Sequence, residues 1–146
     1  MARIVVGIDG SPESVQALHW ALAEAKLRGA ALCVVHTWAY PYIAAGPGLD
    51  PGLDADMIDN AETVAKELVR GELDDLGDKT VGVDIERVIV EGAAAPALLE
   101  AAEGADLLVV GSRGRGGVTG LLLGSVGQHC AHHASCPVVI VRASAH

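Results

Sequence analysis

The sequence is short of aromatic residues and of positive charge. Aromatic residues make up only 3% of the 146 residues, phenylalanine is absent, and 10 Lys and Arg residues stand against 19 Asp and Glu, a formal net charge of -9. Nucleic-acid binding needs basic surface and, for single strands, aromatic side chains on which bases stack. A negative surface is also repelled by anionic lipid headgroups. We therefore expect no nucleic acid and no membrane among the partners.

The sequence also lacks a long apolar run and a disulfide framework. Its apolar runs are about five residues long, far short of the roughly 20 that span a bilayer. The opening segment MARIVVGIDGS meets Asp9 before it forms the apolar stretch of a secretory signal. Cys33, Cys130 and Cys136 are an odd number in a chain of a size that needs no disulfides. These features favour free thiols and predict a cytoplasmic location.

The length and the apolar pattern predict an α/β fold. A chain of 146 residues is the size of one domain, and we expect residues 1–146 to form a single domain. Short continuous runs rich in Val and Ile are typical of strands buried on both faces, as in a parallel sheet. The runs are residues 4–8, 32–37, 86–90, 107–111 and 138–141.

Helical patterns lie between the predicted strands. Ser11 can cap a first helix that has Pro12 at its first position and ends at Gly29. A second, acidic helix is predicted from about residue 54 to residue 76, ended by Gly77, and two more at 94–105 and 125–135. Strand and helix thus alternate, which favours right-handed crossovers with helices on both sheet faces. The predicted inner faces comprise Val15, Leu18, Leu22 and Ala25 in the first helix, and Met57, Ala61, Val64, Ala65 and Leu68 in the second.

Two loops are the first places to look for a ligand. In open parallel sheets, ligands lie beyond the carboxyl ends of the strands, where the strand order reverses. Asp9, Gly10 and Ser11 follow the first strand, and Gly111 begins the loop after the fourth. If those strands are neighbours, the two loops form one site. A third segment, 39–52, holds three prolines and three glycines; we interpret it as a loop that either acts as a lid or is a tolerated insertion.

The glycine-rich stretch 109–129 has the features of a phosphate site. Gly111 and Gly114 suit a backbone of positive φ, or one so close to a ligand that a Cβ would collide. Gly124 and Ser125 open the fourth helix, where free N–H groups and the helix dipole favour a phosphate. Alternatively, the glycines form an ordinary loop and Ser125 is only an N-cap. A P-loop would need Lys where Gly124 stands, and GIDGSP does not spell a dinucleotide fingerprint.

The spacing Gly111-x2-Gly114-x9-Gly124-Ser125 resembles a motif of the universal stress protein family, whose nucleotide-binding members carry G-x2-G-x9-G-[S/T]. IVVGIDGSPES, VEGAAAPALLEAA and CPVVIVR resemble other segments of that family, so the resemblance covers nearly the whole chain. It implies a Rossmann-like, open parallel five-stranded sheet in the order 3-2-1-4-5. It also implies homodimers that meet along the last strand, Val138, Val139, Ile140 and Val141.

The resemblance further implies an ATP site. By motif position, the glycines, Ser125 and Val126 would surround ribose and phosphates, and adenine would rest near Thr37, where many relatives have Val. Asp9 would lie near the phosphates or hold Mg²⁺, unless it caps the first helix. Arg113 and Arg115 either neutralise phosphate charge or are solvated. The expected site comprises Asp9, Gly10, Ser11, Thr37, Gly111, Arg113, Gly114, Gly124, Ser125 and Val126.

Other chemistry-bearing residues point less clearly to a site. The cluster HCAHHASC, 129–136, holds zinc-ligating residue types, but His129, His132 and His133 share one helical face while Cys130 points elsewhere. We interpret these histidines as an exposed face or a dimer edge. His36, at the end of the second strand, is expected to be a packed, hydrogen-bonded histidine rather than a general base.

The sequence thus favours ATP binding in stress response or signalling, with nucleotide-dependent dimer or partner contacts. No nucleophile beside a base and no poised pair of carboxylates emerges, so the sequence favours binding over catalysis. A slow ATPase or autophosphorylating enzyme using Asp9, Mg²⁺ and Ser125 stays open. So does a dimeric interaction module that binds AMP, a cyclic nucleotide or no nucleotide.

Overall fold

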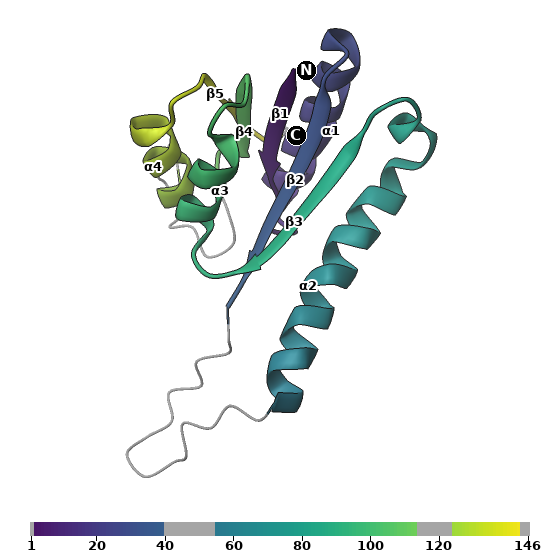
Figure 1. Cartoon of the computed structure of the whole chain (residues 1–146), viewed down its shortest axis with the longest axis vertical. Coiled ribbons are helices and arrows are strands. Elements are labelled where there is room, and N and C mark those ends of the chain that lie inside the picture. Colours follow the sequence, from purple (N-terminus) through teal and green to yellow (C-terminus); the bar gives the residue numbers. More distant parts are fainter. Residues whose placement is uncertain (1, 40–54, 114–123, 144–146) are drawn as a thin grey trace.

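The chain folds into a parallel sheet between two layers of helices (Figure 1). A computed structural model describes residues 2–39, 55–113 and 124–143. The strands stand in the order β3-β2-β1-β4-β5 and every neighbouring pair is parallel, as predicted. The elements are β1 (Arg3–Gly7), α1 (Pro12–Arg28), β2 (Ala31–Trp38), α2 (Ala55–Leu76), a 3₁₀ turn (Gly77–Thr80), β3 (Ile85–Glu91), α3 (Ala94–Ala102), β4 (Leu107–Gly111), α4 (Ser125–His133) and β5 (Val138–Val141).

The three central strands are buried on both faces, which explains their continuous apolar runs. Alternate side chains of β1, such as Ile4 and Val6, pack under α1 and α2, while Val5 packs under α3 and α4. Both edge strands are more exposed: Glu86 and Arg87 of β3 reach solvent, and all four residues of β5 are half-buried. The sheet thus has two separate cores, one on each face.

Helix α1 begins and ends where the sequence predicts. The hydroxyl oxygen of Ser11 accepts a hydrogen bond from the N–H of Ser14, and Gly29 ends the helix with φ of 64°. Of the predicted inner face, Leu18, Leu22 and Ala25 are buried, whereas Val15 is only half-buried. The face turns slightly, so that Ser14, Ala17 and Ala21 also lie against the sheet.

Helix α2 packs on a different stripe from the predicted one. Its buried residues are Ala65, Val69, Leu73 and Leu76, at steps of four, four and three. The prediction for Val64 is wrong, because its side chain is 58% exposed. Ala61 is half-buried, Leu68 packs at the margin of the core, and the side chain of Met57 lies outside the described residues. The C-terminal half of α2 therefore supplies most of its packing.

The other segment boundaries differ only at the ends. Helix α3 ends at Ala102 rather than 105, and α4 ends at His133 rather than 135. Gly77, with φ of 56°, follows α2 as its predicted stop. Most of the predicted loop 39–52 lies outside the described residues, so its role as a lid or insertion stays a prediction. Within the described ranges, no helix is both long and apolar enough to cross a bilayer.

Candidate functional site

A pocket of about 70 Å³ lies at the carboxyl ends of β1, β2 and β4. Strands β1 and β4 are neighbours, as the topology argument required, so the segments that follow them begin side by side, although residues 114–123 lie outside the described residues. Helices α3 and α4 close the pocket from one face of the sheet. Apolar side chains form most of the lining, and Asp9, Ser14 and Thr37 supply its polar groups. The full described lining is Gly7, Ile8, Asp9, Ser14, Val35, Thr37, Ala94, Leu98, Val110, Gly111 and Val126.

Hydrogen bonds close the loop between β1 and α1. The Ser11 N–H donates to Oδ1 of Asp9 at 2.9 Å, and the Asp9 N–H donates to Oγ of Ser14 at 3.1 Å. The Ser14 hydroxyl in turn donates to the Ser11 carbonyl at 3.1 Å. Gly10 has φ of 82°, a conformation that a residue with a Cβ rarely adopts. The loop thus fixes Asp9, while Ser11 rather than Asp9 caps the helix.

Gly111 is required by a neighbouring helix. Its φ is not positive, contrary to one of the two reasons offered for the glycine. A Cβ at this position would lie 2.8 Å from the backbone carbon of Glu13 in the first turn of α1. Such a contact is far inside the normal van der Waals range, so α1 approaches β4 closely only because residue 111 has no side chain.

The N-terminus of α4 lies beside the pocket, and no side chain of the described residues caps it. Gly124 precedes the helix with φ of -70° and has no side chain that could cap it. Its N–H donates to the Ser112 carbonyl at 2.6 Å, which ties the start of α4 to the end of β4. The first N–H groups of a helix have no partner inside it. Val126, the second residue of α4, lines the pocket, so the start of this helix lies next to that region.

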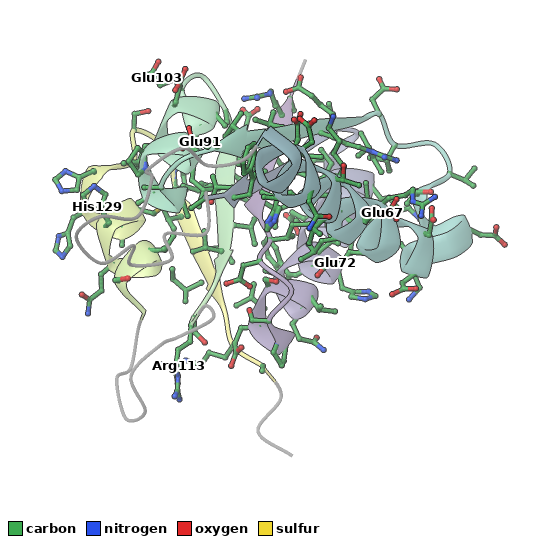
Figure 2. All side chains as sticks on the ribbon, turned by 90° about the horizontal axis from the view of Figure 1, so that it is seen from below. Glu67, Glu72, Glu91, Glu103, Arg113 and His129 are labelled. Carbon is green, nitrogen blue, oxygen red and sulfur yellow. The ribbon has the colours of Figure 1, made fainter. Side chains whose placement is uncertain are left out.

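The structure brings together only part of the predicted site. Asp9, Thr37, Gly111 and Val126 line the pocket. Gly10, Ser11, Gly124 and Ser125 belong to the surrounding loops and helix start but not to its wall. Arg113 is exposed, and Figure 2 shows its side chain projecting away from the body of the molecule. Gly114 lies outside the described residues, as does Arg115.

Several residues of the wall were missed by sequence reasoning. Ser14 lies inside α1, where a serine gives no local signal of a site. Ala94 and Leu98 belong to α3 and resemble ordinary core residues in sequence. Their common property is that α3 packs over the ends of β1 and β2, which the alternation of strands and helices could have suggested.

The thiols are poor nucleophiles. Burial, reinforced by a contact with Glu86, raises the pKa of Cys33 from 9.0 to about 11. Burial also raises the pKa of Cys130 and of Cys136. All three thiols therefore stay protonated near neutral pH, and the thiolate is the reactive form.

The histidines occupy two different settings. His36 is 9% exposed, and its Nδ1 lies 2.8 Å from the Ile8 carbonyl, in agreement with a packed, hydrogen-bonded residue. His129, His132 and His133 are exposed on α4, while Cys130 is buried, as the helical spacing predicted. The rings of His129 and His133 lie 4.5 Å apart, and His129 projects outward in Figure 2. Within the described ranges, no three His, Cys, Asp or Glu side chains are grouped to hold a metal.

Two relatives are similar in sequence to nearly the whole chain. A universal stress protein of Mycobacterium tuberculosis is 40% identical over 143 residues, which cover 98% of this chain and 46% of the relative. A second universal stress protein of that species is 38% identical over 143 residues, covering 98% and 46%. The chain thus spans about half the length of these relatives.

Solved structures of universal stress proteins superimpose on nearly the whole chain. The universal stress protein UspA of Lactobacillus plantarum superimposes with a TM-score of 0.79 at 21% identity, covering 97% of both chains, which supports the fold alone. A universal stress protein described in complex with cAMP superimposes with a TM-score of 0.72 at 30% identity, covering 98% of both chains. The universal stress protein family model matches residues 1–142. The chain therefore belongs to the universal stress protein family.

Proposed function

We propose that the protein binds a nucleotide, with ATP as the first candidate, in the pocket at the ends of β1, β2 and β4. The observation that carries this proposal is the meeting of an apolar pocket with the uncapped start of α4. An apolar cavity suits a base or sugar, while free helix amides and a positive dipole end suit phosphate. The enclosed volume of about 70 Å³ is smaller than a nucleotide, so the phosphates would extend beyond the pocket.

Each part of the proposed ligand would contact particular helices, strands or loops around the pocket. Thr37, at the end of β2, would lie by the base, with Leu98 of α3 as an apolar contact. Gly124, Ser125 and Val126 would meet the phosphates. Asp9 fits a Mg²⁺ ion, because this ion typically takes one or two carboxylates together with phosphate oxygens. Gly10, Ser11, Gly111, Arg113 and Gly114 belong to the same two loops and complete the proposed site.

A monophosphate or cyclic nucleotide is the second candidate. The relative described in complex with cAMP is 30% identical to this chain, and one from Archaeoglobus fulgidus is described in complex with dAMP. A helix N-terminus recognises one phosphate without requiring more. Competition among ATP, AMP and cAMP therefore decides the ligand class.

We further propose that the nucleotide acts through a homodimer and partner contacts in stress response or signalling. The strand β5 ends the sheet, and an unpaired apolar edge favours pairing with another chain. The Leu108 N–H donates to the Pro137 carbonyl and the Ser112 N–H to the Val141 carbonyl, at 2.9 and 2.8 Å. Because alternate residues point the same way, the backbone groups of Val138 and Ile140 face outward, toward the proposed partner strand.

Calorimetric titration of nucleotide-stripped protein with ATP and Mg²⁺ tests the proposal. Micromolar affinity, about -8 kcal/mol, is expected. Ala94→Phe should place a ring in the pocket and abolish binding, whereas Ala131→Phe, on the exposed side of α4, should not. The double substitution Gly114→Val with Ser125→Ala should also weaken binding. Unchanged affinity in both pocket variants would place the ligand elsewhere.

Two further measurements separate the alternatives. Phosphate release above background that disappears in Asp9→Ala would show a slow ATPase rather than a binding protein. Sedimentation of Ile140→Pro, which removes an outward N–H from β5, should show monomers where Ile140→Val shows dimers. If neither ATP nor Ile140→Pro changes the fraction of dimer, the signalling model as stated is excluded.

A further inference from the structure

A second and larger pocket lies on the opposite face of the sheet, between the end of β2 and helix α2. Its volume is about 520 Å³, within the range of small-molecule sites. It shares Asp9 and Thr37 with the first pocket, and otherwise has its own described wall. Trp38, Ala61, Val64 and Leu68 make that wall largely apolar.

His36 is the polar centre of this pocket. Its side chain is 9% exposed and lies on the α2 face of β2, like Val34 two residues earlier. Nδ1 lies 2.8 Å from the Ile8 carbonyl, so it carries the proton and donates. In the neutral ring, Nε2 is then an acceptor, directed away from Ile8. Within the described residues, the hydrogen bond of the His36 ring is the one at Nδ1. Nε2 is not among the buried atoms left without a partner there, so it is reached from the space of the pocket.

An acceptor that solvent can reach is hydrogen-bonded to water until a ligand replaces that water. Here the ring lines a pocket, so a ligand that donates a hydrogen bond would satisfy Nε2. Val64 adds a second indication, because it is an apolar residue left 58% exposed in an otherwise acidic helix, and it faces this space. The wall thus offers apolar contact and a directed acceptor.

The charge of the pocket selects against anions. Asp9 contributes a carboxylate, and no Lys or Arg occurs in the described wall. The α2 residues that contribute are 60–68, beyond the first turn of a helix that begins at Ala55, so their N–H groups are used within the helix. Neither a basic side chain nor a helix end is therefore available to a phosphate there.

From these features we propose that the α2-side pocket is a binding site for a planar nitrogen heterocycle that carries N–H donors and no negative charge. His36 Nε2 accepts one of its N–H groups, and the apolar side chains of α2 with Trp38 cover its flat faces. The site shares Asp9 and Thr37 with the proposed nucleotide site but differs from it in the rest of its wall, its preferred charge and its face of the sheet.

Titration with 2-aminobenzimidazole tests the proposal, with 2-naphthoate as a planar anion of similar size. Calorimetry and amide NMR should show binding of the first compound only, with shifts centred on His36, Asn60 and Val64. His36→Asn keeps an N–H near the position of Nδ1 but removes Nε2, and should weaken binding at least tenfold at unchanged melting temperature. Failure of wild-type protein to bind, equal binding of naphthoate, or shifts centred on Leu98 and Val126 would each overturn the proposal.

A second pair of variants keeps the test independent of how His36→Asn folds. Ala61→Phe should fill the pocket and block the compound. Thr63→Phe is its matched control, because Thr63 is exposed on the same helix and does not line the pocket. Equal binding by both variants would show that the compound sits elsewhere on the protein.

Discussion

Helices α1 and α4 both begin at the proposed nucleotide pocket, but their first turns are built differently. Ser11 caps α1 with its hydroxyl, Asp9 holds the N–H of Ser11, and Pro12 brings no N–H to that turn. Helix α4 begins after Gly124, which has no side chain. Side chains thus accept hydrogen bonds from the N–H groups of Ser11 and Ser14 at the start of α1, whereas no side chain of the described residues caps the start of α4.

This difference divides structural from binding roles within one site. A capped helix start stabilises the fold, and the Ser11 cap also fixes the loop that carries Asp9. An uncapped start forgoes that stabilisation and keeps its dipole end for an anion. Changes at the two ends should accordingly separate stability from affinity.

The largest expected effect is at Gly111, where β4 packs against the first turn of α1. Gly111→Val should lower the free energy of unfolding by about 3 kcal/mol, because its side chain would enter the backbone of Glu13. Urea denaturation measures this. Gly71→Ala is the control: nothing lies within 4 Å of a Cβ there, and the change should stabilise α2 by roughly 0.5–1 kcal/mol. A Gly111→Val protein as stable as wild type would contradict the close approach.

The pH dependence of stability through Cys33, which lies at neither helix start, provides a reference for comparing the two helix starts. The folded state holds the Cys33 proton up to a pKa of about 11, against 9.0 unfolded. The folded state thus binds more protons between these values, so stability should fall by about 2 kcal/mol as pH rises from 9 to 11. Cys33→Ala should flatten this part of the profile in chemical denaturation. An unchanged slope would mean that another group titrates there.

Ser125→Glu should act in opposite directions on helix and ligand. The carboxylate at the first position of α4 favours the helix dipole, so thermal stability should rise slightly. The same charge should repel the phosphates and lower ATP affinity about tenfold, close to 1.4 kcal/mol. Calorimetry and thermal melting together test both signs. If Ser125→Glu and wild type bind ATP with equal affinity, the phosphates do not bind at this helix end.

Ser11→Ala should show the reverse pattern, at smaller size. Loss of the cap is expected to lower the free energy of unfolding by about 1 kcal/mol. The hydroxyl of Ser11 is used by the cap, so Ser11 would contact the nucleotide through its backbone, which the substitution keeps, and ATP affinity should stay within about twofold of wild type. Denaturation and calorimetry again give both values. A variant with full stability but lost affinity would reverse the roles assigned to the two ends.

The sequence pattern was sufficient for the strands of the sheet, while their order followed from the family resemblance. Runs such as Ile4 to Val6 are continuous because both faces of a central strand are covered, and such runs can be recognised locally. The role of Gly111 could not be recognised in this way, because its neighbour Glu13 is far away in sequence. Helix α2 has two apolar stripes of helical period, and only packing decides that Val69 is buried and Val64 exposed.

Gly7 and Gly111 give the carboxyl edge of the sheet a further property. A Cβ at Gly7 would lie 2.9 Å from the side chain of Leu98 on α3, and one at Gly111 would meet α1 on the other face. Helices α1 and α3 thus pack closely against the two faces of the sheet beside the proposed site. Amide hydrogens at the ends of β1 and β4 should therefore exchange slowly with solvent, with or without ligand. A bound nucleotide should instead slow exchange in the first turn of α4, so that its signature is local rather than spread through the sheet.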